Sequence, residues 1–355
     1  MRREFVAAAA PGQARAGAGG HPCQGVWHAP AGRQPRVGFI ATHYEVDFSE
    51  HYLAEYLAAR GYGMLGWNTR YRGNGAYFAL DNALTDIGVG VEWMRREAGV
   101  DTVVLIGNSG GASLMGAYQA RALDPARGLP AADLFVSLNA HPGRPDVLTS
   151  WLDPSVTDEA DPLSVDPSLS MFEPGNGPPY DPAFVERYRA AQRARNDRIT
   201  AWCHKELERL GAGGAFDRVF DVYRTWADLR FSDLSIDPSD RAPGCYFGDP
   251  RFANYSPFGL ATTNTCRSWL SMWSLADSEC RTELHLPSVT VPSLVVQSTE
   301  DQGCYPSDAR AIFGALGSQD KTLEWMKGDH YLQAPPEGRD QVADLIGAWV
   351  DARTK

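Results

Sequence analysis

Three features that would each define a class of protein are missing from this sequence. Its 355 residues carry a formal net charge of −11, so it lacks the basic excess typical of nucleic-acid-binding proteins. It has no run of about twenty apolar residues, the length that a membrane-spanning helix requires. Its six cysteines include neither a Cys-x-x-Cys pair nor a Cys/His zinc pattern. We therefore expect no nucleic-acid partner, no membrane span and no bound metal.

The spacing of the cysteines also bears on where the protein works. They are scattered, which is typical of thiols in a reducing cytoplasm, and we expect a cytoplasmic location. The alternative is an exported protein with one or two disulfides, drawn from Cys245, Cys266, Cys280 and Cys304.

The first 24 residues show no periodic pattern and are rich in alanine, glycine and arginine. Residues 5–10 are an uncharged, apolar run. The run is short and follows Glu4, so it matches a signal peptide only faintly. We expect residues 1–24 to be a flexible tail. Residues 26–29 are a candidate edge strand.

The most informative stretch is 102–122. Residues 102–106 are apolar and mostly β-branched, as in a buried parallel strand. They lead into Gly107-x-Ser109-x-Gly111, and 112–122 has apolar residues at helical spacing. A sharp turn between a strand and a helix would expose the serine hydroxyl at the helix N-terminus, and small flanking residues leave room for it.

The stretches on both sides of this motif alternate between strand and helix. This alternation predicts a mostly parallel sheet flanked by helices, with functional side chains at the carboxyl ends of the strands. We expect strands at 36–42, 62–68, 102–106, 134–139, 293–298 and 321–326, and helices at 49–60, 80–97, 112–122, 307–316 and 337–351.

Gly107-x-Ser109-x-Gly111, in this setting, resembles the nucleophile elbow of the α/β-hydrolase superfamily. The order of candidate residues also matches the family, because Ser109, Asp301 and His330 follow one another as nucleophile, acid and base, each just after an expected strand. Alternative acids are Glu300, Asp329 and, after the strand at 134–139, Asp146.

The resemblance also implies an oxyanion hole made of two backbone N–H groups. One would come from Gly110, the residue after the nucleophile, and the other from Tyr44 (or Glu45), after the strand at 36–42. The family often has His-Gly at this second place, whereas this chain has His43-Tyr44. We expect His43 to brace the loop.

Residues 142–289 interrupt the alternation. They begin with Asp-Pro and Gly-Pro-Pro turns and continue with expected helices at 182–210, 216–226 and 266–273. This stretch resembles the helical cap that many α/β hydrolases carry, so we expect a core of 25–141 and 290–355 and a cap of 142–289. Of its aromatic residues, Trp269 and Trp273 are our candidates for substrate contact.

One expected cap helix carries five arginines: Arg187, Arg189, Arg193, Arg195 and Arg198. They form either a solvated face, paired with Glu186 and Asp197, or a site for an anionic substrate.

The resemblance implies a serine hydrolase that cleaves a carboxylic ester through an acyl-enzyme, without a cofactor. The aromatic-rich insertion favours a small-molecule ester that is apolar or aromatic. A thioesterase, an amidase or a peptidase would use the same three residues, and a ligand-binding protein without turnover could share the scaffold. The oligomeric state stays open, a homo-oligomer included.

Overall fold

The computed structural model describes residues 1–12 and 21–354, and its contacts divide the chain into two units. The sheet unit comprises Met1–Gly75, Leu80–Pro142 and Arg281–Lys355, and the insertion unit comprises Ala76–Ala79 and Gly143–Cys280. The sequence-predicted cap extended further, to residue 289. Helix α8 (Thr282–His285) instead packs against α3 (Gly111–Ala122) of the sheet unit, which is why the boundary lies earlier.

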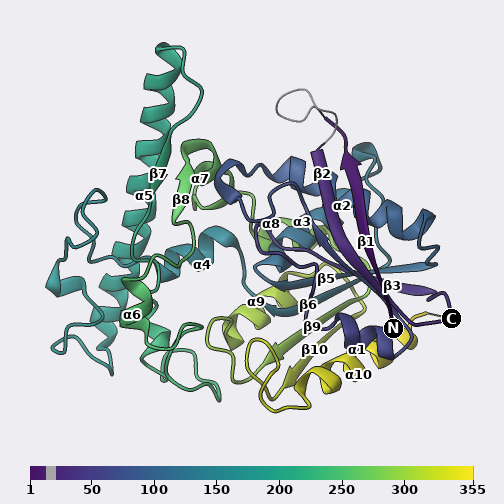
Figure 1. Cartoon of the computed structure of the whole chain (residues 1–355). Helices are drawn as coiled ribbons and strands as arrows, with labels where there is room; N and C mark the ends of the chain where they lie inside the picture. The colour runs from purple at the N-terminus through teal and green to yellow at the C-terminus, as the bar shows by residue number, and fades with distance from the viewer. Residues whose placement is uncertain (13–20, 355) are drawn as a thin grey trace. The chain divides into compact units, whose positions relative to one another are not determined.

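The described part of the sheet unit holds one eight-stranded, mostly parallel sheet with the strand order β1-β2-β4-β3-β5-β6-β9-β10 (Figure 1). From β4 through β3, β5, β6 and β9 to β10, each strand pairs in parallel with the next. The pairings of β1 with β2 and of β2 with β4 are antiparallel. Their bounds are β1 (Arg2–Ala10), β2 (His21–Ala29), β3 (Val37–Ala41), β4 (Gly63–Asn68), β5 (Thr102–Ser109), β6 (Leu134–Ala140), β9 (Ser293–Ser298) and β10 (Lys321–Met326).

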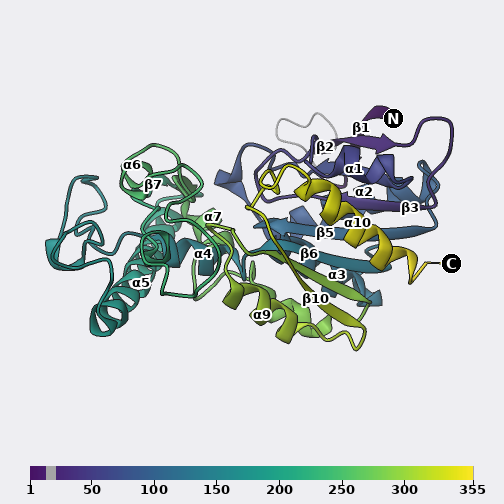
Figure 2. The same ribbon diagram turned by 90° about the horizontal axis from the view of Figure 1, so that it is seen from below.

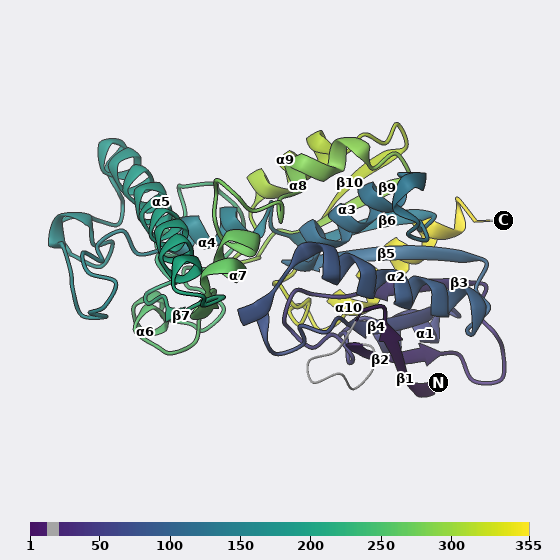
Figure 3. The ribbon, with the colours of Figure 1, turned by 90° about the horizontal axis from the view of Figure 1, so that it is seen from above.

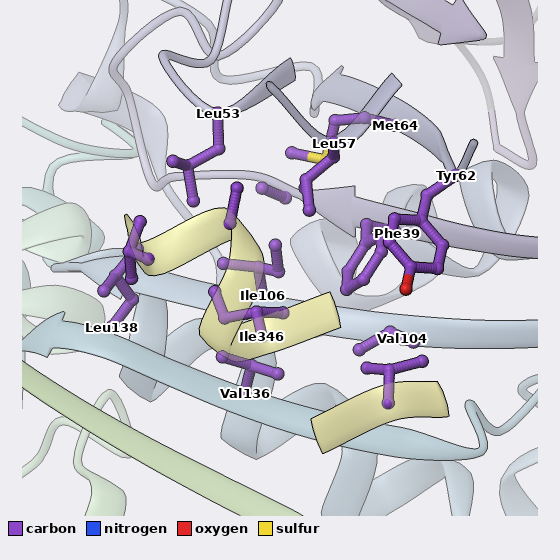
Figure 4. Close-up of a cluster of buried hydrophobic side chains, with 14 of the residues drawn as sticks. Phe39, Leu53, Leu57, Tyr62, Met64, Val104, Ile106, Val136, Leu138 and Ile346 are labelled. Atoms are coloured by element: carbon purple, nitrogen blue, oxygen red, sulfur yellow. The ribbon is translucent and has the colours of Figure 1, made fainter. Parts of the chain in front are cut away.

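The central strands are buried on both faces, which explains their nearly continuous apolar sequences. One face packs against α1 (Ala54–Ala59) and α10 (Gly338–Asp351), and Ile346 of α10 lies in the same cluster as Ile106 and Val136 of the sheet (Figure 4). In Figure 2, α10 crosses this face in yellow.

The opposite side of the sheet contacts α2 (Leu80–Arg96), α3 and α9 (Pro306–Ala315), which are visible in Figure 3. In α2 the buried residues recur every three or four positions, so one stripe of the helix faces the sheet. These helices and crossovers place the ends of β3, β5, β6, β9 and β10 at one edge of the sheet.

The N-terminal region corrects one prediction. Residues 2–10 and 21–24, expected in a flexible tail, belong to β1 and β2, whose pairing extends from Arg2↔Ala29 to Ala10↔His21. Trp27 of β2 is fully buried and packs edge-on against Trp93 at 5.7 Å between ring centroids. The sheet supplies the hydrogen bonds and burial that the alanine-rich sequence does not suggest. Residues 13–20 of the predicted tail lie outside the described residues.

Two predicted helices also differ. The helix expected at 49–60 begins only at Ala54, because residues 48–53 form turns in which His51 N–H donates to the Phe48 carbonyl. The stretch expected as a helix at 216–226 instead contains the strand β7 (Val219–Asp221), which pairs with β8 (Thr263–Thr265).

The insertion unit is built around the 31-residue helix α5 (Pro182–Ala212), which contacts α4 (Arg144–Trp151) and α7 (Cys266–Met272). Figure 1 shows β7, β8 and α7 beside α5. A short helix, α6 (Pro250–Asn254), completes it. The described residues of both units also include short 3₁₀ helices at Gly75–Tyr77, Pro125–Arg127, Pro167–Leu169, Leu229–Phe231 and Leu286–Ser288. Among the helices described, none is both long enough and apolar enough to cross a bilayer.

The arginine-rich helix is α5, and two of its arginines have roles that the sequence did not predict. Arg189 pairs with the buried Asp228 at 2.7 Å, and Arg195, which is fully buried, pairs with Glu159 at 2.7 Å. Neither pairs with the carboxylates expected from its own helix. These two guanidinium groups are therefore used inside the insertion unit, and they do not form a solvated face.

Candidate active site

The turn between β5 and α3 has the strained form that the Gly-x-Ser-x-Gly motif predicts. Ser109 has a φ of 55°, in the left-handed region that side chains rarely adopt, and α3 begins two residues later. A methyl group at Gly107 would lie 2.6 Å from Ala112 Cα, and one at Gly111 would lie 2.4 Å from the carbonyl oxygen of Thr42. Both glycines are therefore required by the close approach of backbone to backbone.

The structure brings Ser109, His330 and Asp301 together in one hydrogen-bonded chain. His330 Nε2 lies 3.1 Å from Ser109 Oγ, and His330 Nδ1 lies 2.7 Å from Asp301 Oδ2. Ser109 is the last residue of β5, Asp301 follows β9 and His330 follows β10, so the ends of three separate strands supply the three side chains. Asp301 and His330 are buried. A hydroxyl, an imidazole and a carboxylate in this order can transfer a proton from the hydroxyl to the ring.

The backbone holds Asp301 in a fixed orientation. Its Oδ1 accepts hydrogen bonds from the N–H groups of Gly303 at 2.8 Å and Cys304 at 2.9 Å, so Oδ2 is directed at the histidine. The alternative acids are engaged elsewhere. Glu300 lies 3.8 Å from Lys327 Nζ.

Asp329 and Asp146 also have other surroundings. Asp329 Oδ1 accepts from the N–H groups of Tyr331 and Gln333, at 3.1 and 2.8 Å, and so stabilises the turn that follows His330. Asp146 lies in α4 of the insertion unit.

The loop after β3 lies against the start of α3. The Tyr44 side chain is fully buried, and its hydroxyl is 2.9 Å from Ser113 Oγ. His43 Nδ1 accepts from the Val46 N–H at 3.3 Å, a contact that braces the loop. Gly110 caps α3, where backbone N–H groups have no partner within the helix. The assignment of the Tyr44 and Gly110 N–H groups to an oxyanion hole stays a prediction.

Trp269 and Trp273 are both buried within the insertion unit, and their assignment to substrate contact stays a prediction. Trp269 is fully buried, and its Nε1–H donates to Thr200 Oγ1 at 3.0 Å. Trp273 is buried beneath Arg144, whose guanidinium carbon is 4.4 Å from the ring centroid. The sequence pattern shows that the two tryptophans have helical spacing. It cannot distinguish a helix face that packs in the interior from a helix face that lines a pocket.

The surroundings of the candidate site disfavour charge. Burial lowers the pKa of His51, whose Nε2 is 3.2 Å from Asn108 Oδ1, to about 4. Burial, together with the charge of Asp301, raises the pKa of Tyr331, whose ring is edge-on to His330. The ion pair between Asp301 and a protonated His330 would thus form in a region of low polarity.

One group of side chains in the described residues could hold a metal ion. The ligand atoms of Asp301, Cys304 and His330 lie within 4.8 Å of one another. Two of these ligands are already hydrogen-bonded to each other, and the Cys304 thiol donates to the Asn139 carbonyl at 3.0 Å. Nothing in the sequence spacing indicated that Cys304 would lie here.

No protein-family model matches the sequence. Over 94 residues it is 33% identical to monoglyceride lipase of Homo sapiens, and over 93 residues it is 29% identical to that of Mus musculus. Each match covers 25% of this chain and 31% of the lipase, so the chain matches less than a third of the length of these relatives.

Solved structures resemble the chain over nearly all its length. The α/β hydrolase GrgF from Penicillium sp. sh18 has a TM-score of 0.56 at 11% identity, with 99% of this chain and 97% of that chain covered. A putative hydrolase from Agrobacterium vitis S4 has a TM-score of 0.51 at 16% identity, with 98% and 99% covered. Identities this low establish the fold alone, and the chain has the fold of the α/β hydrolases.

Proposed function

We propose that the protein is a serine hydrolase that cleaves a carboxylic ester through an acyl-enzyme intermediate. The observation that carries the proposal is the chain of two hydrogen bonds from Ser109 through His330 to Asp301, at 3.1 and 2.7 Å. A ligand-binding protein would have no use for a strained serine held against a histidine whose other nitrogen is bonded to a buried carboxylate.

In the proposed reaction, Ser109 Oγ attacks the ester carbonyl carbon while its proton passes to His330 Nε2. Asp301 holds the ring in place and stabilises its charged form. The tetrahedral intermediate collapses, the C–O bond to the alcohol breaks, and the alcohol leaves with the proton from His330. Water then gives a proton to His330, attacks the acyl-enzyme and releases the acid, after which Ser109 regains its proton.

The negative charge of the tetrahedral oxygen requires donors. We assign this role to the backbone N–H groups of Gly110 and Tyr44, because Gly110 lies at the N-terminus of α3 and the Tyr44 loop is fixed against the same helix by Ser113. Each donor of this kind typically lowers the barrier by about 3 kcal/mol.

The substrate we propose is an ester with an apolar acyl chain. The partial likeness to monoglyceride lipases favours a monoacylglycerol as the first natural compound to test. We retain a cytoplasmic location as a proposal, from the scattered cysteines.

Fluorophosphonate labelling of the full chain tests the proposal, with Ser109→Ala as the variant. Ser318→Ala is the matched control, because the Ser318 hydroxyl is buried and donates to the Asp320 carbonyl before β10, away from the carboxyl edge of the sheet. We expect the wild type and the control to be labelled and Ser109→Ala to be inert.

p-Nitrophenyl esters of increasing acyl length, with a thioester and an anilide of the same acyl group, then define the bond cleaved. Preference for the thioester or the anilide would replace the ester assignment. A folded wild type that reacts with neither probe nor substrates would overturn the proposal in favour of a binding protein.

A further inference from the structure

Asn139 occupies an unusual position at the end of β6. It is fully buried and has a φ of 43°, a left-handed conformation that asparagine tolerates better than most residues. The pairing of β5 with β6 slips at this point, since Asn108 is opposite Leu138 whereas Ser109 is opposite Ala140. Asn139 is therefore the residue left out of register directly beside the serine.

The Asn139 side chain connects the two loops that carry the histidine and the acid. Its Nδ2–H donates to the carbonyl oxygen of His330 at 3.1 Å. Its Oδ1 accepts from the N–H of Ser298 at 2.8 Å, and Ser298 is the last residue of β9, three positions before Asp301. Both hydrogen bonds are buried, where an unmade bond would be costly.

The main chain of Asn139 adds a third connection. Its carbonyl oxygen accepts from the Cys304 thiol at 3.0 Å, and the Cys304 N–H in turn donates to Asp301. One residue thus links the strand beside Ser109, the loop of Asp301 and the loop of His330. The loop after His330 has little regular structure of its own up to α10, and Leu332 is also left-handed, so an anchor at His330 matters there.

We propose that Asn139 is a positioning residue that holds the His330 loop and the end of β9 in the register that aligns Ser109, His330 and Asp301. The proposal rests on the function proposed above. Its physical basis is the steep dependence of proton transfer on geometry, because a displacement of about 1 Å at such a site lowers the rate on the order of a hundredfold. The amide suits the role, since one of its atoms must donate and the other must accept.

Asn139→Asp separates positioning from simple stability. The substitution keeps the size of the side chain and the acceptor for Ser298, but it replaces the donor to the His330 carbonyl with an oxygen. Gln119→Glu is the matched control. Gln119 is equally buried in α3, its Nε2–H donates to the Ala132 carbonyl at 2.8 Å and its Oε1 accepts from the Ala132 N–H at 3.1 Å, with no contact to His330 or Asp301.

We expect Asn139→Asp to lower kcat by about tenfold to a hundredfold, with KM within about twofold, and to slow fluorophosphonate labelling in parallel. We expect Gln119→Glu to retain wild-type kcat. The Asn139→Asp deficit should also shrink as the pH falls, because a protonated carboxyl at position 139 can again donate to the His330 carbonyl. The activity ratio of Gln119→Glu to wild type should show no such trend.

The outcomes separate this proposal from the proposed function. Loss of activity in Ser109→Ala with wild-type kcat in folded Asn139→Asp would overturn the positioning role alone, and an equal kcat loss in Gln119→Glu would do so as well. Full activity of Ser109→Ala would overturn the function itself. If Asn139→Asp does not fold, Asn139→Gly, which accepts the left-handed backbone and lacks only the side chain, decides the question by the same kcat criterion.

Discussion

His51 is held in its neutral form by two hydrogen bonds in the sheet unit. Its Nδ1 accepts from the Leu53 N–H at 3.2 Å, so the other nitrogen, Nε2, carries the proton that faces Asn108 Oδ1. A proton on Nδ1 would point at the Leu53 N–H, so two donors would face each other in a buried site. Burial lowers the pKa of His51 from 6.5 to about 4. His51 therefore couples folding to pH.

The sign of this coupling follows from proton binding. Between pH 6.5 and 4 the unfolded chain binds a proton at His51 that the folded chain does not, so the free energy of unfolding falls as the pH falls. At about 1.4 kcal/mol per pH unit, we expect His51 to cost wild type about 2 kcal/mol on going from pH 7.5 to pH 5. Urea unfolding of wild type and His51→Asn at these two pH values measures the difference.

The control for this measurement is Ser318→Ala, because it removes a buried hydrogen-bonding side chain that carries no titratable group. We expect it to keep the wild-type pH dependence, whereas His51→Asn should lose about 2 kcal/mol less than wild type on acidification. Identical pH dependence of the unfolding free energy in wild type and His51→Asn would contradict this prediction, because it would mean that His51 binds protons equally in the folded and unfolded chains.

At the scale of elements, β1 is the strand least visible in the sequence, and adjacent residues test it. The side chain of Val6 is buried and that of Phe5 is 64% exposed, as expected for opposite faces of a strand. We expect Val6→Asp to lower the free energy of unfolding by at least about 2 kcal/mol, because it removes a buried apolar group and buries a carboxylate. Phe5→Asp should change it little.

Chemical denaturation of the two variants distinguishes the alternatives. A flexible tail predicts that neither substitution alters the unfolding midpoint, whereas a strand of the sheet predicts a loss confined to Val6→Asp. Equal midpoints for both variants and wild type would contradict the pairing of β1 with β2.

Elements with strong apolar patterns could be predicted from the sequence, and elements defined by distant pairing could not. Residues 102–106 identify a buried strand because the sequence itself is apolar and β-branched. In contrast, the alanines of β1 form a strand because they pair with β2, and Val219 lies in a strand because it pairs with Thr265. Such partners lie outside any local window, so tertiary pairing decides the structure.

The same division applies to the candidate site. The sequence placed Ser109, Asp301 and His330 at strand ends, and the parallel topology brings those ends together. The contacts of Cys304 could not be predicted from the sequence, because they depend on the turn from Asp301 to Cys304, in which the Cys304 N–H donates to the Asp301 carboxylate. The substrate role of Trp269 stays a prediction, and its burial could not be foreseen because helical spacing does not say which neighbour covers an indole.

At the scale of the whole molecule, the chain has separate hydrophobic cores in its two units. The core of the sheet unit consists of residues from the strands, α1 and α10. In the insertion unit, one cluster surrounds Trp151, Trp226 and Phe231, and another contains Tyr188. Each unit therefore buries its own apolar surface, and local disruption of one core should leave the other packed.

Asp153 offers a way to disrupt the insertion unit alone. It is fully buried, pairs with the buried Arg224 and accepts from Asn254 Nδ2 at 2.7 Å. Asp153→Ala leaves the Arg224 guanidinium buried without this carboxylate, which typically costs about 3–5 kcal/mol. We expect hydrogen exchange measured by mass spectrometry to show lost protection in α5 and at 220–260, while β5 and β6 keep theirs.

The matched control is Glu92→Ala, which removes one member of the exposed pair between Glu92 and Arg96 in α2. An exposed pair at this spacing contributes only about 0.3–0.5 kcal/mol, so exchange should stay as in wild type throughout. Simultaneous loss of protection in β5, β6 and α5 on Asp153→Ala would show that the two cores unfold together. Loss confined to the insertion unit would mean that the strands carrying Ser109 and Asn139 keep their register without it.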